Sequence, residues 1–243
     1  MNIEKIFDDI KFKVSPKDDY RSSYRFRFIK SFYKIFKKEK NYVFDNCIIN
    51  KEKIDLDLRK ELIKIDSMST YAIGYLINRI CKNLSKNQVY LNVGCWKGFS
   101  LVAGMINTEC KVIGVDNFSQ FTGPKNDFIK NFENSKKSNH FFFEQDYEKY
   151  FQFLDHTKDK FDFYFYDGEH SYDNQFKNLE IADNFLNVGS LVLIDDINFD
   201  EVYERLSVLV SDFRQGKMSV ELVQSNSPTP KATYSTRPRC QAK

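Results

Sequence analysis

The sequence predicts an α/β fold in which a doubly wound, mostly parallel sheet follows a helical N-terminal extension. After residue 86, short apolar segments alternate with amphipathic segments, an order that is typical of parallel sheets with helical crossovers. The short segments are apolar at nearly every position, as expected for strands covered on both faces. Before residue 86, apolar residues recur three or four positions apart, which indicates helices.

The same spacing places each element. The helices expected in the N-terminal part are residues 3–10, 20–40, 52–64 and 68–83, the last with Ser67 or Ser69 as its N-cap. The strands expected after residue 86 are residues 88–93, 111–116, 140–145, 161–167, 190–196 and 218–224. The helices expected between and after these strands are residues 98–107, 125–135, 146–155, 171–186 and 199–213.

Three parts of the chain are expected from this pattern. Residues 1–85 form a helical extension or cap, residues 86–224 the α/β domain, and residues 225–243 an irregular or disordered tail. The tail holds three of the five prolines of the chain and almost no large aliphatic residue. A length of 243 residues suffices for one large domain with a smaller appendage.

Composition and charge restrict the class of protein. The net charge of +3 is too small to predict a polyanionic partner for the whole molecule. The five cysteines form no CxxC pair, which argues against a disulfide framework or a zinc site and fits a reducing cytoplasm. No signal peptide is recognised, and no apolar run approaches the roughly 18 residues of a membrane span.

A basic, aromatic stretch lies at residues 20–40, with eight Lys or Arg residues and a single acid, Glu39. It permits three interpretations: a solvated helix that covers the sheet, a nucleic-acid or membrane surface, or part of an acceptor pocket. We favour the first, because its aromatic residues need a surface to pack on. A nucleic-acid partner is not expected.

A glycine turn follows the first strand of the α/β part. Gly94 and Gly98 lie where that strand passes into a helix, and open sheets of this kind bind ligands at the carboxyl ends of their strands. The GxxxG spacing is not the GxGxxG of dinucleotide-binding oxidoreductases and lacks the lysine of a phosphate loop. Asp116 ends the second strand, where a carboxylate can hold the hydroxyls of a ribose. We therefore expect a nucleoside ligand without a pyrophosphate, although such a turn can also serve packing alone.

Three carboxylates are expected at the same edge of the sheet. Asp167 ends the fourth strand, and Asp195 and Asp196 end the fifth. Like charges that meet there raise one another's pKa or require a cation, and oxygen ligands suit Mg2+, Mn2+ or Ca2+. His170 follows closely and could take a proton from a hydroxyl. The alternatives are that Asp167 caps a helix, that the aspartate pair is solvated and that His170 is structural.

The segments "GCWKGFS", "VIGVD", "YDGEHSY" and "LIDDIN" together resemble the class I S-adenosylmethionine-dependent methyltransferases, over residues 86 to about 224. They are similar in particular to the metal-dependent subgroup that methylates hydroxyls of sugars and macrolide sugars. The resemblance implies a Rossmann-like sheet of seven strands. It also implies a cofactor site formed by Asn92, Gly94, Cys95, Trp96, Gly98, Ser100, Asp116 and Asp146.

By the same resemblance, Asp167, Asp195 and Asp196 hold a divalent cation, Mg2+ or Mn2+, and His170 is the catalytic base. Glu169 matches no fixed ligand position. Asn92 departs from the family, which usually has Asp or Glu there to hold the amino group of the cofactor.

The resulting hypothesis is an O-methyltransferase that uses S-adenosylmethionine and a divalent cation to methylate a hydroxyl of a sugar or glycosylated small molecule. Two alternatives stay open. One is a methyltransferase for RNA or another polyanion, with residues 20–40 as its docking surface. The other is a non-catalytic protein that binds S-adenosylmethionine, for which Asn92 is mild support. Self-association to a homo-oligomer is also left open.

Overall fold

A computed structural model describes residues 10–12, 47–49, 53–120, 124–169, 171–195 and 219–220. The predicted segments at 20–40 and 199–213 and the tail at 225–243 lie outside these residues, and the N-terminal segment 3–10 does so except for Ile10. Within the described residues, no helix has both the length and the apolar character that a membrane crossing requires.

The central feature is a parallel sheet of six described strands in the order β5-β4-β3-β6-β7-β8. The strands are β3 (Val89–Val93), β4 (Lys111–Asp116), β5 (His140–Glu144), β6 (Phe161–Tyr166), β7 (Leu186–Ile194) and β8 (Ser219–Val220). The order reverses between β3 and β6, as in a doubly wound fold, so the predicted fold class is confirmed. A seventh strand is not confirmed by the part of the chain that the structure describes.

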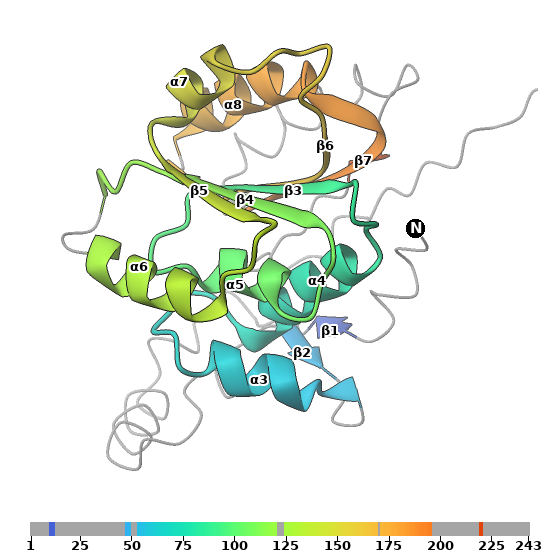
Figure 1. Cartoon of the computed structure of the whole chain (residues 1–243), viewed down its shortest axis with the longest axis vertical. Helices are drawn as coiled ribbons and strands as arrows, with labels where there is room; N and C mark the ends of the chain where they lie inside the picture. The colour runs from blue at the N-terminus through green and yellow to red at the C-terminus, as the bar shows by residue number, and fades with distance from the viewer. Residues whose placement is uncertain are drawn as a thin grey trace, which may run out of the picture.

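Helices cover both faces of the sheet (Figure 1). On one face lie α3 (Leu56–Leu62), α4 (Tyr71–Lys82), α5 (Phe99–Met105) and α6 (Pro124–Ser135). On the other face lie α7 (Tyr147–Gln152) and α8 (Tyr172–Asp183). This arrangement explains why the central strands are apolar on both sides, since β3 and β6 are buried along nearly their whole lengths.

Each face of the sheet has its own apolar core. The core beneath α3 to α6 contains Leu58 and Leu62 of α3 and a long series of residues of α4, together with residues of α5 and the sheet. The second core joins α7 and α8 to the opposite sides of the same strands. The helices predicted at 52–64 and 68–83 are therefore present, and they share one core with the α/β part of the chain.

Three local predictions were wrong. Ile10–Phe12 (β1) and Cys47–Ile49 (β2) form an antiparallel two-stranded sheet that was not predicted; Ile10 was assigned to a helix, and the other five residues to no element. The N-cap of α4 is Thr70, whose hydroxyl accepts a hydrogen bond from the backbone N–H of Ile73, so neither Ser67 nor Ser69 has that role. Strand β7 begins at Leu186, which was assigned to the end of a helix.

Asn78 joins α4 to α5. Its side-chain amide is fully buried and donates hydrogen bonds of 2.8 Å to the carbonyls of Ala103 and Ile106. These carbonyls lie at the C-terminal end of α5, where a helix leaves backbone acceptors without partners. The amide therefore satisfies two groups that water cannot reach.

We predict that Asn78→Ala lowers the free energy of unfolding by about 1–3 kcal/mol, because two buried carbonyls lose their donor. Urea denaturation of both proteins measures the difference. Asn83→Ala is the matched control: its exposed amide donates to the carbonyl of Arg79 at the end of the same helix, and its loss should change stability by no more than about 0.5 kcal/mol. Equal effects of the two substitutions would contradict the structural role of Asn78.

Candidate functional site

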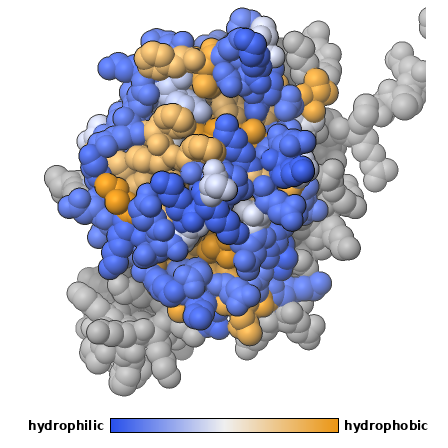
Figure 2. All heavy atoms as spheres, in the orientation of Figure 1, coloured by the Kyte–Doolittle hydropathy of each residue, from blue (hydrophilic) through white to orange (hydrophobic). Residues whose placement is uncertain are grey.

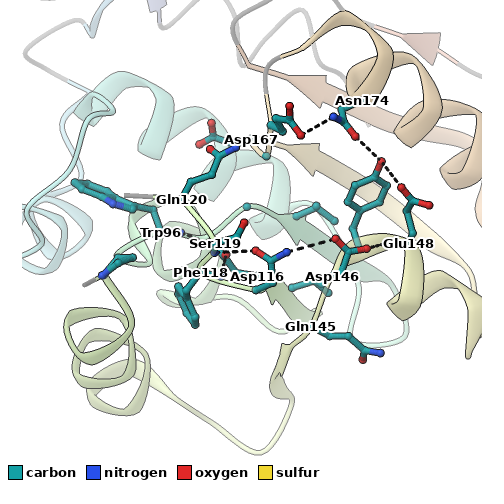
Figure 3. Close-up of a pocket in the computed structure, with 18 residues that line it drawn as sticks. Trp96, Asp116, Phe118, Ser119, Gln120, Gln145, Asp146, Glu148, Asp167 and Asn174 are labelled. Carbon is teal, nitrogen blue, oxygen red and sulfur yellow. Dashed lines mark hydrogen bonds between the residues drawn. The ribbon is translucent and has the colours of Figure 1, made fainter. Parts of the chain in front are cut away.

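A pocket opens at the carboxyl edge of the sheet, bounded by the segments that follow β3, β4, β5 and β6 (Figure 3). The register of the sheet explains this meeting point, because Val93 lies beside both Val115 and Tyr166, and Tyr166 beside Ile194. The pocket is lined by Val93, Gly94, Trp96, Val115, Asp116, Asn117, Phe118, Ser119, Gln120, Pro124, Gln145, Asp146, Tyr147, Glu148, Asp167, Gly168, Glu169 and Asn174.

The glycine turn permits a close approach between two strand ends. Gly94 has a φ of 80°, in the left-handed region that favours glycine. A Cβ atom on Gly94 would lie 2.0 Å from the carbonyl oxygen of Asp167. Only glycine therefore fits where β3 and β6 end side by side. Gly98, with a φ of 93°, is the N-cap of α5 and completes the turn.

The carboxylate of Asp116 holds this turn in place. One oxygen accepts hydrogen bonds from the backbone N–H groups of Cys95 (2.7 Å) and Trp96 (2.8 Å). The other accepts from the N–H of Phe118 at 2.7 Å. A carboxylate offers about four acceptor positions, so these contacts leave about one for a ligand.

A buried layer lies directly beneath the pocket. The amide of Asn92 donates to the carbonyl of Gly94 at 3.0 Å and accepts from the hydroxyl of Ser100 at 2.7 Å. Asn92, Ser100 and Cys95 are all buried, and burial raises the pKa of the Cys95 thiol. These three residues and Gly98 support the turn without lining the pocket, whereas Gly94, Trp96, Asp116 and Asp146 line it.

The lining is strongly acidic. Among the described residues, the lining contains the five carboxylates of Asp116, Asp146, Glu148, Asp167 and Glu169 and no lysine or arginine. Asp146 caps α7 by accepting from the N–H of Glu148 at 2.9 Å. Glu148 also pairs with Lys177, which lies outside the lining, at 2.7 Å. The remaining carboxylates outnumber the basic side chains of the described lining, so the pocket favours a ligand that carries positive charge.

Polar groups on one wall form a hydrogen-bonded chain, visible in Figure 3. Asn174 of α8 donates to the carboxylate of Glu169 at 2.5 Å, and its amide oxygen accepts from the hydroxyl of Tyr147 at 3.3 Å. Burial, reinforced by the nearby carboxylate of Glu148, raises the pKa of Tyr147, so its hydroxyl keeps its proton and acts as a donor. Asn174 and Tyr147 were missed in the sequence analysis, although Asn174 lies four residues after His170 in the sequence and Tyr147 directly follows Asp146.

The residues expected to hold a cation are only partly described. Asp167 and Asp195 directly follow the neighbouring strands β6 and β7, with the N–H of Asp195 donating to the carbonyl of Tyr166 at 3.0 Å. Asp167 lines the pocket and Asp195 does not. Asp196 and His170 lie outside the described residues. Among the residues that are described, no three or more His, Cys, Asp or Glu side chains are grouped so that they could hold a metal ion.

The two other histidines have no part in the pocket. His140 is buried in β5, where burial lowers its pKa to about 4, and its Nδ1 accepts from the N–H of Lys137 at 3.0 Å. His156 is exposed in a turn. Both placements agree with the absence of chemically active neighbours in the sequence.

Comparisons with known proteins agree with this architecture. Residues 91–197 match the family described as "Methyltransferase domain". No curated protein sequence gives a significant match. Three solved structures are similar in fold, each with a TM-score of 0.50: an O-methyltransferase from Bacillus cereus in complex with SAH, cofactor-bound Rv0187 from MTB, and precorrin-6y C5,15-methyltransferase from Geobacter metallireducens.

Their sequences have diverged from this chain. The Bacillus cereus protein is 12% identical, with 76% of this chain and 86% of that chain covered. The MTB protein is 13% identical, with 65% of this chain and 78% of that chain covered. The Geobacter protein is 10% identical, with 61% of this chain and 76% of that chain covered. The fold is that of the class I methyltransferases. Together with the match of residues 91–197 to the methyltransferase family, it supports the assignment of the α/β part as an S-adenosylmethionine-dependent methyltransferase domain.

We predict that Gly94→Ala lowers the free energy of unfolding by roughly 3 kcal/mol or more, because its Cβ would collide with backbone atoms. It should also weaken binding of S-adenosylhomocysteine at least about tenfold, since the turn forms one wall of the pocket. Thermal unfolding and isothermal titration measure the two effects.

Gly189→Ala is the matched control. Gly189 has a similar φ of 82° but no atom within 4 Å of its would-be Cβ. Its substitution should cost only the strain of the left-handed conformation, about 1–2 kcal/mol, and leave binding unchanged. If Gly94→Ala behaved like this control, the close approach of β3 and β6 would not matter.

Proposed function

We propose that the protein is an O-methyltransferase that methylates a hydroxyl of a sugar or glycosylated small molecule with the help of a divalent cation. The observation that carries the proposal is the acidic pocket at the carboxyl edge of the sheet, where the glycine turn, Asp116 and Asp146 face Asp167. One of the three expected cation ligands, Asp167, thus lines the same cavity as the expected cofactor residues Gly94, Asp116 and Asp146.

The residues present fit S-adenosylmethionine. The left-handed Gly94 brings the backbone close to a ligand, and Asp116 retains about one acceptor position for a ribose hydroxyl. Val93, Val115 and Phe118 give the pocket apolar surface. When bound, the cofactor supplies a methyl group on a positively charged sulfonium, a charge that suits the acidic lining.

Asp167 and Asp195 would hold the cation together with Asp196. The support is their position at the ends of adjacent strands, which lie about 4.8 Å apart. A divalent cation lowers the pKa of an oxygen that it contacts. His170, three residues after Asp167 in the sequence, would take the proton of the acceptor hydroxyl. The chain of Glu169, Asn174 and Tyr147 offers further hydrogen-bonding groups to an acceptor rich in hydroxyls.

The two alternatives receive less support. A polyanionic acceptor such as RNA would meet five carboxylates and no lysine or arginine in the pocket lining, an electrostatically unfavourable contact. A non-catalytic binding protein was suggested by Asn92. Its buried hydrogen bonds to Ser100 and Gly94 now give Asn92 a role in supporting the turn that implies no loss of catalysis.

We predict that the purified protein transfers a methyl group from S-adenosylmethionine to a sugar hydroxyl, that EDTA abolishes the transfer and that Mg2+ or Mn2+ restores it. A panel of free and glycosidic sugars, followed by mass spectrometry, measures this. His170→Ala should lower kcat about 100-fold to 10,000-fold, the contribution of a general base, while the affinity for S-adenosylhomocysteine stays within about twofold.

His156→Ala is the matched control, because His156 is exposed in a turn away from the pocket, and it should keep full activity. Full activity in EDTA would contradict a role of the cation in the mechanism. Full activity of His170→Ala would contradict the role of His170 as the general base. Tight cofactor binding without transfer to any hydroxyl would instead favour the non-catalytic alternative.

A further inference from the structure

Among the described strands, β5 forms one edge of the sheet, and several of the usual features that prevent pairing are missing from it. Its sequence, His140–Glu144, contains no lysine or proline, and its pairing with β4 has no bulge. No other described strand pairs with its outer side. An edge strand leaves backbone N–H and C=O groups available to another chain, and proteins usually block such edges.

Apolar side chains surround this edge. Ile129, Phe141, Phe143 and Phe153 have exposed fractions of 42%, 40%, 41% and 79%, and they are half of the eight large apolar residues that are exposed in the described chain. They come from α6, from β5 and from the residue that ends α7. Figure 2 shows apolar surface gathered on this side of the molecule. We call these four residues the β5 strip.

The charges on either side of β5 have opposite signs. The five residues before the strand, 135–139, contain Lys136 and Lys137 and no acid. Residues 144–148 contain Glu144, Asp146 and Glu148 and no base. Within the chain, Lys136 pairs with Glu133, Glu144 with Lys125 and Glu148 with Lys177. Two antiparallel copies of this segment would therefore bring the remaining charges, Lys137 of each copy and Asp146 of the other, near one another. A parallel arrangement would place like charges together, which is destabilising.

We propose that β5 pairs antiparallel with β5 of a second copy of this chain, across a two-fold axis near Phe142. In this register Phe141 faces Phe143 of the partner subunit, and Phe143 faces Phe141 of the partner subunit. The two sheets become one, and Phe141 and Phe143 of both copies meet in a single aromatic cluster on the face that α7 covers. Such an interface is isologous, since the same surface serves both copies.

A second copy fits the edge better than an unrelated partner because every feature of the surface is self-complementary. The aromatic residues meet aromatic residues, the basic segment meets the acidic one, and the free backbone groups of one edge meet those of an identical edge. Aromatic pairs directly opposite each other on neighbouring strands stabilise a sheet beyond the area that they bury.

Sedimentation velocity and light scattering of the full chain, from about 1 to 100 μM, test the proposal. We expect a dimer whose dissociation constant rises at least about tenfold in Phe143→Glu, because a charge enters the aromatic cluster. Val188→Glu is the control, since Val188 is 81% exposed in β7, outside the β5 strip, and its dimer should be unchanged. Circular dichroism confirms that both variants fold.

The register has its own test. In the double variant Phe141→Cys and Phe143→Cys, each new thiol faces its counterpart across the axis at a Cα separation of about 4.5–5.5 Å, within disulfide range. Oxidation should cross-link it as a dimer on a non-reducing gel. In the single variant Phe141→Cys, the two new thiols are not directly opposite each other. It should therefore form no more cross-linked dimer than the unsubstituted chain does.

Three results would overturn the proposal. The first is a chain that stays monomeric at every concentration. A monomer whose β5 edge binds an extended peptide of another protein would count as the same result. The second is a dimer whose dissociation constant is the same in Phe143→Glu as in the control variant Val188→Glu. The third is a dimer in which the single and double cysteine variants cross-link equally.

Discussion

The carboxylate of Asp116 is the contact on which the pocket depends. The turn after β3 leaves the N–H groups of Cys95 and Trp96 without partners inside the sheet, and a buried donor without an acceptor is costly. Asp116 accepts both and also holds the N–H of Phe118 in the loop after β4. One side chain thus fixes two of the segments that bound the pocket, and hydrogen bonds to a charged acceptor are the stronger ones.

The second constraint is steric. Gly94 lies so close to the backbone of Asp167 that no side chain fits between them, and the N–H of Asp167 donates to the carbonyl of Val93 at 2.8 Å. The end of β6 is therefore held against the glycine turn by main-chain atoms alone. The position of Asp167 in the pocket follows from that contact, whatever ligand the carboxylate binds.

The sequence was most informative where burial is extreme. Strands such as β3 and β6 are apolar on both faces because helices cover both, and short apolar runs between amphipathic segments are typical of strands covered in this way. The strand predicted at 190–196 starts four residues earlier, at Leu186, because the first part of β7 is irregular: Gly189 has a φ of 82° and the register with β6 shifts. Glycine marks a departure from regular geometry without revealing which one.

Within the pocket, the residues predicted to bind the cofactor lie at two different depths, which the sequence did not predict. Asn92 and Trp96 are close along the chain, yet Asn92 is buried beneath the turn and Trp96 lines the pocket. Depth depends on which way the turn folds, and Trp96 itself has a φ of 45° that no spacing rule predicts. The roles assigned to His170 and Asp196 remain predictions, since both lie outside the described residues.

The charge of the pocket lining bears on which form of the cofactor binds more strongly. Among the described residues, five carboxylates line the pocket and no lysine or arginine does, so its potential favours a cation over a neutral ligand of the same shape. A cofactor with a sulfonium carries one more positive charge than the thioether that methyl transfer leaves behind. We therefore expect this electrostatic contribution to favour binding of the sulfonium form over the thioether form, and hence exchange of the spent cofactor after a transfer.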